Sequence, residues 1–289
     1  MASQLPDGSK IKLIATDLDG TLLNDEGQVS EKTKEVVGKI LKKYPHLHFV
    51  IATGRTRQAT IYVREALNII NKPNTESITS NGCVIHDSNN KIIYKNTLPS
   101  EYILKFHDLM IANPKALYGY TYGDGFVVFD EIFAKKLREI IKENVTVMEE
   151  EEHINKVKSG EMADINKVSY MGFFAGQETM KKLEKLKEEY NLEKAQYDSI
   201  IVEYMPHGTN KGTGLAQLIK NLNISKDEVI AFGDGGNDIE FLQNAGWPIA
   251  MENARDVLKP FAKYIAKSNS EDGVADILER IFLKDEITN

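Results

Sequence analysis

The chain has 289 residues, of which 42% are hydrophobic and 27% are charged, and its formal net charge is −7. This composition is ordinary for a globular protein, and the acidic balance argues against a nucleic-acid-binding surface. The single cysteine, Cys83, excludes an intramolecular disulfide and a cysteine-rich zinc site. The polar residues 1–10 lack the apolar stretch of a secretory signal, and no apolar run has membrane-spanning length. We therefore expect a cytoplasmic protein with neither a membrane nor a nucleic acid as partner.

The first part of the chain alternates between short apolar runs and segments with helical periodicity. The predicted strands are residues 11–16, 47–52 and 77–85, the last with a break at 80–82, and the predicted helices are 31–43 and 57–69. Strands and helices in strict alternation are typical of an α/β fold with a Rossmann-like, doubly wound parallel sheet.

The pattern changes over residues 87–202, where hairpins are mixed with helices. We predict hairpins at 84–94 and 117–129, helices at 99–112, 131–143 and 177–190, strands at 168–174 and 199–204, and an acidic loop at 149–165. Such a mixture favours a separate α+β module. We expect this module to be inserted into a core formed by residues 1–86 and 203–289.

The alternating pattern resumes after Pro206. Helices are predicted at 210–222, 237–245 and 273–283, and strands at 229–232, 248–251 and 264–266. The carboxyl ends of parallel strands are where an open α/β sheet binds its ligands, so the residues that follow the strands are the candidates for a site.

Two acidic residues follow the first predicted strand, in Asp17-Leu18-Asp19-Gly20-Thr21-Leu22. Because side chains alternate in an extended segment, Asp17 and Asp19 can point the same way. Two neighbouring carboxylates repel each other unless a cation or a shared proton compensates. A Mg²⁺ site, or a nucleophile beside a general acid, would use such a pair. The alternative is a loop in which the aspartates only form Asx turns.

Three further segments lie at strand ends or helix starts. Thr53-Gly54-Arg55 offers a hydroxyl and a free backbone amide to a phosphate, although it can equally be an ordinary turn. Lys211 begins a helix, where a cation is unfavourable unless it faces an anion, and the alternative is a solvated surface lysine. The segment 233–238, with three glycines and two aspartates, is either a ligand-binding loop or a connection capped by Asp238. Collected at one sheet edge, these groups have the composition of a Mg²⁺-assisted phosphoryl-transfer site.

The order and spacing of these motifs resemble the haloacid dehalogenase superfamily, and within it the Cof-type phosphatases that carry a type IIB α+β cap. The resemblance covers nearly the whole chain and includes Ser80-Asn81-Gly82, although Cys83 stands where a smaller residue is usual. It implies a catalytic core with an inserted cap, residues 87–202, that selects the substrate.

The resemblance also implies a role for each motif residue. Asp17 would attack phosphorus and form an aspartyl-phosphate, and Asp19 would act as the general acid and base. Mg²⁺ would be held by Asp17, the main-chain carbonyl of Asp19, and Asp234. The residues implied to bind the transferring phosphate are Leu18, through its backbone N–H, Thr53, Gly54, Lys211 and Asn237. Asp238 would support the metal site or orient Lys211.

The resulting hypothesis is a Mg²⁺-dependent phosphatase acting on small phosphomonoesters, with sugar phosphates as the expected class. One alternative is a phosphomutase similar to phosphomannomutase, which would need a second basic phosphate site. Arg138 is the only arginine within residues 87–202, and this argues against that alternative. The other alternative is a catalytically idle regulator that binds a metabolite. The presence of Asp17, Asp19, Lys211 and Asp234 argues against it, because a sensor has no need of a nucleophile.

Overall fold

A computed structural model describes residues 5–113, 115–197 and 200–284, and the chain divides into two compact units. The first unit comprises Met1–Gly54, Ile61–Ile93 and Asn210–Asn289, and the second comprises Arg55–Thr60 and Tyr94–Thr209. Each unit contains its own sheet. Within the described ranges, no helix is long and apolar enough to cross a membrane.

The first unit is built on a sheet with the order β14-β13-β12-β1-β2-β3-β4-β5 among the described residues. Its strands are β1 (Leu13–Thr16), β2 (His48–Ala52), β3 (Ser77–Thr79), β4 (Val84–His86), β5 (Ile92–Lys95), β12 (Val229–Gly233), β13 (Trp247–Met251) and β14 (Tyr264–Ala266). Every neighbouring pair from β14 to β3 is parallel. The predicted α/β fold with a parallel sheet is therefore confirmed.

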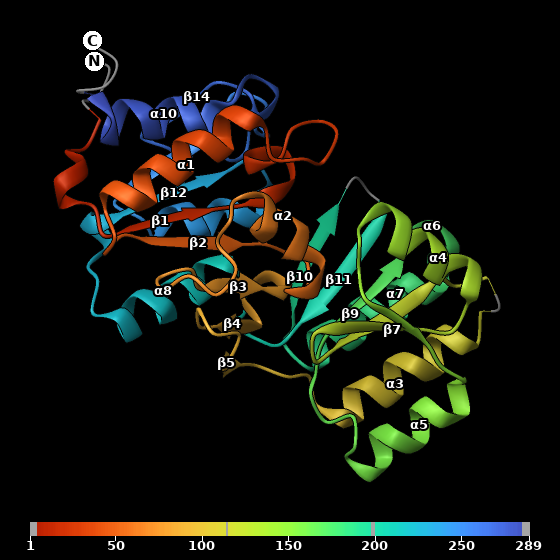
Figure 1. Cartoon of the computed structure of the whole chain (residues 1–289). Helices are drawn as coiled ribbons and strands as arrows, with labels where there is room; N and C mark the ends of the chain where they lie inside the picture. The colour runs from red at the N-terminus through yellow and green to blue at the C-terminus, as the bar shows by residue number, and fades with distance from the viewer. Residues whose placement is uncertain (1–4, 114, 198–199, 285–289) are drawn as a thin grey trace. The chain divides into compact units, whose positions relative to one another are not determined.

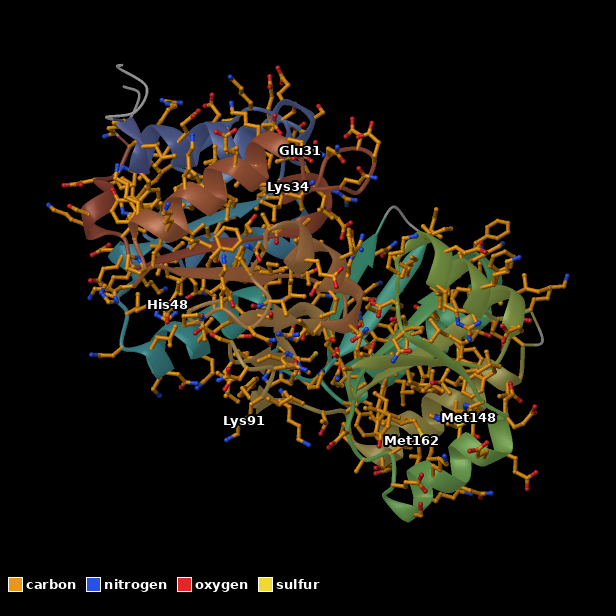
Figure 2. The ribbon with its side chains drawn as sticks, in the orientation of Figure 1. Glu31, Lys34, His48, Lys91, Met148 and Met162 are labelled. Atoms are coloured by element: carbon orange, nitrogen blue, oxygen red, sulfur yellow. The ribbon has the colours of Figure 1, made fainter. Side chains whose placement is uncertain are left out.

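Helices cover both faces of this sheet: Figure 1 shows α1 and α10 over one face and α8 over the other. The helices of the first unit are α1 (Glu31–Lys43), α2 (Ile61–Ala66), α8 (Lys211–Leu222), α9 (Ile239–Gln243) and α10 (Gly273–Phe282). Helix α1 shows why they form where the sequence predicts. The Ser30 hydroxyl accepts a hydrogen bond from the Thr33 amide at 3.0 Å, and Lys34 pairs with Glu31 at 2.7 Å in the first turn (Figure 2).

The prediction of a single interrupted strand at 77–85 is wrong, because this part of the chain forms two antiparallel strands, β3 and β4. Ser77 of β3 pairs with His86 of β4. The turn that joins them has φ of +50° at Ser80, +55° at Asn81 and +96° at Gly82. Three successive residues with positive φ reverse the chain, which a strand with a local bulge does not do.

The second unit has the predicted α+β character. Its described strands form a sheet with the order β10-β11-β9-β6-β7-β8, antiparallel except between β7 and β8. The strands are β6 (Tyr118–Tyr122), β7 (Gly125–Val128), β8 (Val145–Val147), β9 (Ile165–Met171), β10 (Glu193–Tyr197) and β11 (Ile201–Met205), and the helices are α3 (Ser100–Ile111), α4 (Glu131–Ile140), α5 (Glu150–Ser159), α6 (Gly172–Ala175) and α7 (Gln177–Glu189).

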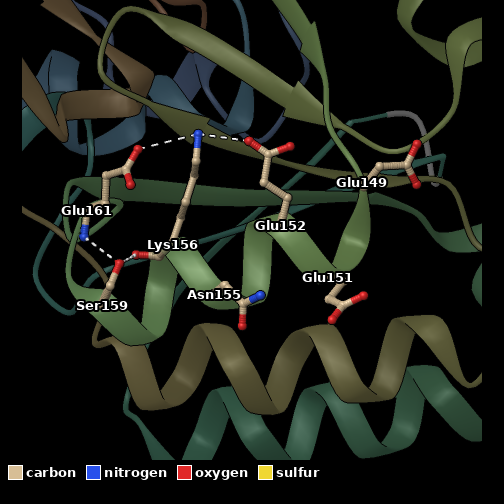
Figure 3. Close-up of a pocket in the computed structure, with 7 residues that line it drawn as sticks. All are labelled: Glu149, Glu151, Glu152, Asn155, Lys156, Ser159 and Glu161. Carbon is tan, nitrogen blue, oxygen red and sulfur yellow. Dashed lines mark hydrogen bonds and ion pairs between the residues drawn. The ribbon is translucent and has the colours of Figure 1, made fainter.

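The predicted acidic loop at 149–165 is wrong, because helix α5 occupies most of it. His153 and Val157, four residues apart, are buried on one face. Lys156 pairs with Glu152 at 2.9 Å and with Glu161 at 3.4 Å (Figure 3). Charged residues on the exposed face obscure the helical period in the sequence, while the i,i+4 ion pair supports the helix. Strands β8 and β10 were also not predicted, and Ser199, the expected start of β11, lies outside the described residues.

An aromatic and histidine-containing core fills the second unit. His107 of α3 and His153 of α5 are both fully buried, and His153 stacks on Tyr120 with ring centroids 4.3 Å apart. The His107 Nδ1 lies 3.2 Å from the Tyr120 hydroxyl. Within the part of the chain that the structure describes, His107 Nε2 and both nitrogens of His153 have no hydrogen-bond partner. These rings are therefore buried as neutral imidazoles.

We predict that the His153 ring makes the second unit sensitive to acid. Burial, with a smaller contribution from His107, lowers the pKa of His153 from its usual 6.5 to about 4. Between pH 6.5 and about pH 4, His153 is protonated in the unfolded chain and neutral in the folded chain. The free energy of unfolding therefore falls as the pH decreases through that window. The full loss is about 3 kcal/mol.

Urea unfolding followed by circular dichroism between pH 4 and 8 measures this loss, because that range includes the His153 pKa of the folded chain and that of the unfolded chain. The variant His153→Phe, which keeps a ring over Tyr120, should lose this part of the pH dependence. The variant His46→Phe, at an exposed position, should retain it. Equal pH profiles for wild type and His153→Phe would contradict the prediction.

Candidate active site

The parallel register of the first unit brings the predicted motifs to one edge of its sheet. Thr16, the last residue of β1, is paired with Phe232 of β12 and with Ile51 of β2. The Asp17 amide donates to the Phe232 carbonyl at 3.0 Å, and the Thr53 amide donates to the Ile78 carbonyl at 2.9 Å. The segments that follow β1, β2 and β12 therefore leave the sheet side by side, as the sequence predicted.

Lys211 lies at the centre of the site, although its side chain is only 1% exposed. Its Nζ is 2.8 Å from Asp17 Oδ1 and 2.8 Å from Asp238 Oδ1. The lysine begins α8, where the helix dipole disfavours a cation, so these two carboxylates are what make the position tolerable. The interpretation of Lys211 as a solvated surface residue is thereby excluded.

Asp238 organises the glycine-rich loop from within. Its Oδ2 accepts hydrogen bonds from the backbone amides of Asp234, at 3.1 Å, and Gly235, at 3.0 Å. Its Oδ1 accepts from Lys211, so both oxygens are engaged. Asp238 thus holds the loop and orients the lysine.

Asp234 reaches across to the first loop. Its Oδ1 accepts a hydrogen bond from the Thr21 hydroxyl at 2.8 Å. Gly20 has a φ of +74°, and a Cβ at that position would lie 2.4 Å from Asp234 Oδ2. Only glycine allows the two loops to approach this closely. Asp19, between Asp17 and Gly20, is exposed to solvent.

Among the described residues that form this cluster, Asp17, Asp234, Asp238 and Lys211, carboxylates outnumber ammonium groups. Burial raises the pKa of Asp17 well above its usual range, although Lys211 opposes the shift. Burial also raises the pKa of Asp234 to about 6, and the neighbouring Asp238 adds to the shift. Burial disfavours the charged form of Lys211, but Asp17 and Asp238 outweigh it and raise its pKa. One ammonium thus faces three carboxylates, and an additional cation would relieve the excess negative charge.

The donor set fits a hard divalent cation. Ligand atoms of Asp17, Asp234 and Asp238 all lie within 4.8 Å of one another. Carboxylate oxygens are the ligands that Mg²⁺ prefers. Because both oxygens of Asp238 already accept hydrogen bonds, Asp17 and Asp234 are the side chains best placed to bind the ion.

Asn81 is a part of the site whose role the sequence did not define. It is 2% exposed, its backbone amide donates to the Thr53 carbonyl at 3.0 Å, and its Oδ1 accepts from Asn237 Nδ2 at 3.2 Å. Asn81 therefore connects two of the predicted phosphate-binding residues. The available signal in the sequence was the pair Asn81-Gly82, because asparagine and glycine adopt the αL conformation found at Asn81 more readily than most residues.

A surface pocket in the second unit has the wrong charge for a phosphate ester. The residues that line it are Glu149, Glu151, Glu152, Asn155, Lys156, Ser159 and Glu161 (Figure 3). Four glutamates against one lysine repel an anion, so this pocket is not a candidate for the phosphate site.

Comparisons with known proteins identify relatives of this chain. Residues 14–278 match the family model described as haloacid dehalogenase-like hydrolase. The chain is 32% identical over 270 residues to a 5-amino-6-(5-phospho-D-ribitylamino)uracil phosphatase of Bacillus subtilis, covering 92% of this chain and 93% of the relative. It is 30% identical over 292 residues to an uncharacterized hydrolase of Schizosaccharomyces pombe, covering 97% and 93% of the two chains.

Solved structures show the same architecture. A haloacid dehalogenase-like hydrolase from Bacteroides thetaiotaomicron superposes with a TM-score of 0.79 and 26% identity, covering 94% of this chain and 100% of the other. A sugar phosphatase of subclass IIB superposes with a TM-score of 0.76 and 23% identity, covering 93% and 98%, and shows a similarity of fold.

We predict that Gly82→Ala disrupts the site through the backbone. Gly82 has a φ of +96°, and a Cβ there would lie 2.1 Å from the Asn210 carbonyl oxygen, immediately before Lys211. The start of α8 would have to move, at a cost of at least about 3 kcal/mol in unfolding free energy. Gly38→Ala is the matched control, since Gly38 lies within α1 with nothing near its Cβ position. That change should stabilise the protein by up to about 1 kcal/mol. Urea unfolding of both variants measures the difference, and similar values for the two would be incompatible with the tight approach.

Proposed function

The match of residues 14–278 to the family model shows that the chain belongs to the haloacid dehalogenase-like hydrolase family. We propose that it hydrolyses small phosphomonoesters with Mg²⁺ through an aspartyl-phosphate at Asp17. Membership of this family, with relatives named as phosphatases, makes it a phosphoric monoester hydrolase. The observation that carries the proposal is the buried contact between Asp17 and Lys211 beside Asp234.

Asp17 is the proposed nucleophile. A carboxylate oxygen of Asp17 forms a bond to phosphorus as the bond from phosphorus to the ester oxygen breaks. A water molecule then attacks the same phosphorus, which releases inorganic phosphate and restores the Asp17 carboxylate. Lys211 offsets the repulsion between the carboxylate and the anionic phosphate in both steps.

Asp19 is the proposed general acid and base. Its exposed side chain can take a proton from solvent, donate it to the leaving ester oxygen, and later accept one from the attacking water. Asp19 is proposed to contribute only its main-chain carbonyl to the metal, which leaves its carboxylate available for proton transfer.

Mg²⁺ is the proposed cofactor, held by Asp17, the Asp19 carbonyl and Asp234. When bound, it neutralises negative charge on the phosphate oxygens. Asp238 keeps Asp234 and Lys211 in position through its hydrogen bonds.

The transferring phosphate is proposed to bind Thr53, Gly54, Lys211, Asn237 and the backbone amide of Leu18. In the structure the Leu18 amide donates to Asp17 Oδ1 at 2.7 Å, beside the atom proposed to attack. This amide would exchange the carboxylate for a phosphate oxygen when the substrate binds. Asn81 holds Thr53 and Asn237 in place through its hydrogen bonds to the Thr53 carbonyl and the Asn237 side-chain amide.

Small phosphorylated sugars and polyols are the proposed substrates. The Bacillus subtilis relative is named for a substrate with a phosphate on a ribityl chain, which is a polyol. We propose that the second unit, corresponding to the cap expected over residues 87–202, selects the organic part of the ester. A cytoplasmic location is also proposed, because a chain with the single cysteine Cys83 has no intramolecular disulfide, which suits a reducing compartment.

A buried polar group in the second unit is suited to recognise hydroxyl groups. Lys167 Nζ lies 2.7 Å from Glu203 Oε1, which also accepts from the Ser169 hydroxyl at 3.0 Å. Val168 and Tyr170, which alternate with these residues along β9, belong to the aromatic core, so Lys167 and Ser169 point to the opposite face of the sheet. A buried ion pair contributes little to stability, so its presence favours a role in recognition.

We predict that Asp17→Asn abolishes hydrolysis of p-nitrophenyl phosphate while the protein remains folded. The amide is a poor nucleophile, so release of phosphate should fall by at least about a thousandfold. Released phosphate is assayed with millimolar Mg²⁺ and after chelation, and circular dichroism verifies the fold. Retained activity in the variant would refute the mechanism. The same assay with a hexose phosphate and a bisphosphate activator would reveal isomer formation if the enzyme were instead a mutase.

We predict that Lys167→Met changes substrate preference more than catalysis. Loss of a charged hydrogen-bond donor should lower kcat/KM for sugar and polyol phosphates by about 10-fold or more. The value for p-nitrophenyl phosphate, whose leaving group has no hydroxyl to recognise, should change by less than about twofold. Lys182→Met removes an exposed lysine of α7 and serves as the control. Equal losses on both substrates would argue for a purely structural role of Lys167.

A further inference from the structure

A short segment that follows the Thr53-Gly54 motif is grouped with the second unit. Residues Arg55–Thr60 belong to the second unit, whereas Gly54 and Ile61 on either side belong to the first. The hydrogen bonds made by this segment show what holds it there. They come from two places in the second unit: the end of helix α4 and the turn between β6 and β7.

Glu143, which follows α4, binds Thr56 with both carboxylate oxygens. Its Oε1 accepts from the Thr56 amide at 3.1 Å, and its Oε2 accepts from the Thr56 hydroxyl at 2.5 Å. Hydrogen bonds to a carboxylate are stronger than those between neutral groups, and two of them fix orientation as well as distance. Thr56 is 2% exposed, so competition from water is small. The same hydroxyl accepts from the Ala59 amide at 3.3 Å, which ties Glu143 to the next helical turn.

Two more contacts hold the rest of the segment. Asp124, in the turn between β6 and β7, accepts at Oδ1 from the Gln58 amide at 3.0 Å. Arg55 donates from Nη1 to the Ile141 carbonyl at 3.3 Å, at the end of α4, where helix carbonyls lack internal partners. The segment is thus held at Arg55, Thr56 and Gln58.

We propose that Glu143 and Asp124 are positioning residues for the phosphate-binding backbone at Thr53 and Gly54. This inference rests on the proposed function, which assigns those two residues to the phosphate. The Thr53 amide donates a hydrogen bond to the Ile78 carbonyl, and the Thr56 amide and hydroxyl donate hydrogen bonds to Glu143. Only two residues lie between these anchors, and one is Gly54, whose flexible backbone is costly to order. Because Gly54 is two residues from Thr56 along the chain, hydrogen bonds that restrain Thr56 also restrict the backbone of Gly54 before the phosphate arrives.

The arrangement makes phosphate binding depend on residues of the second unit that need not touch the phosphate. Neither Glu143 nor Asp124 suits direct contact, because a carboxylate repels an anion. Their effect is transmitted through the peptide chain from Thr56 to Gly54. The second unit would therefore influence catalysis as well as substrate choice.

The test compares Glu143→Ala, Glu143→Gln and Asp124→Ala with wild type in the full-length chain. Glu139→Ala is the matched control, because Glu139 lies on α4 and is exposed, and its carboxylate is 3.9 Å from the ammonium of Lys135. Two quantities are measured: the affinity for inorganic phosphate in the presence of Mg²⁺, by calorimetry, and hydrogen–deuterium exchange of peptides that cover residues 53–60. Glu143→Gln keeps one acceptor for the Thr56 amide and should give an intermediate result.

We expect about tenfold weaker phosphate binding in Glu143→Ala, together with faster exchange at Thr56, and no change in Glu139→Ala. Asp124→Ala should accelerate exchange at Gln58 and weaken phosphate binding to a smaller extent. Because it breaks a separate contact, it also tests the inference if Glu143→Ala does not fold. Faster exchange without any loss of phosphate affinity would overturn the inference, since the contacts would then be only structural. Wild-type protein that binds phosphate no better than its variants overturns the inference alone, whereas wild-type protein that neither binds phosphate nor hydrolyses esters overturns the proposed function as well.

Discussion

The buried ammonium group of Lys211 is the interaction on which the candidate site depends. Its side chain is 1% exposed and bridges Asp17 and Asp238. Removing one partner from such a buried group leaves an uncompensated charge, at a cost of about 3–5 kcal/mol. The position is demanding for a second reason, because the lysine begins α8, where the helix dipole opposes it. Carboxylates at two strand ends and the lysine at a helix start therefore require one another.

This charged cluster sets tight limits on the backbone around it. Gly82 allows the residue before Lys211 to pass within a distance that any side chain would block, and Gly20 does the same for Asp234. Asn81 then links the loop after β2 with the loop after β12. Segments separated by more than a hundred residues are held together by these contacts at one edge of the sheet.

The second unit combines an apolar core with polar groups that the core does not need. One face of its sheet carries the aromatic cluster, in which two neutral histidines are buried. The Lys167–Glu203 pair lies on the other face. Contacts to Arg55–Thr60 come from a helix end and a turn. A chain inserted in this way can change its polar groups without changing its core, which is how one fold adapts to many substrates.

The sequence alone was sufficient for the elements with strong periodicity and for the motifs that follow buried strands. The parallel strands β1, β2 and β12 were identified because continuous apolar runs mark strands buried on both faces. Helix α5 was missed because most of its residues are charged or polar and only His153 and Val157 are buried, which is too few to show a helical period in the sequence. Only the packing of α5 in the second unit reveals its buried face. The antiparallel reversal at 80–82 was missed because it depends on φ angles that residue types favour but do not impose.

The same division holds for the site. Residue type and spacing predicted a phosphoryl-transfer site that includes Asp17, Asp19, Lys211 and Asp234, and the resemblance to a known family gave each of them an expected role. Only the tertiary structure shows that both carboxylate oxygens of Asp238 accept hydrogen bonds, one from Lys211 and the other from the loop amides. It also decided that Asn81 joins Thr53 to Asn237, and that Glu143 binds Thr56. Those contacts join residues far apart in the chain, and only the folded backbone sets the distances at which they form.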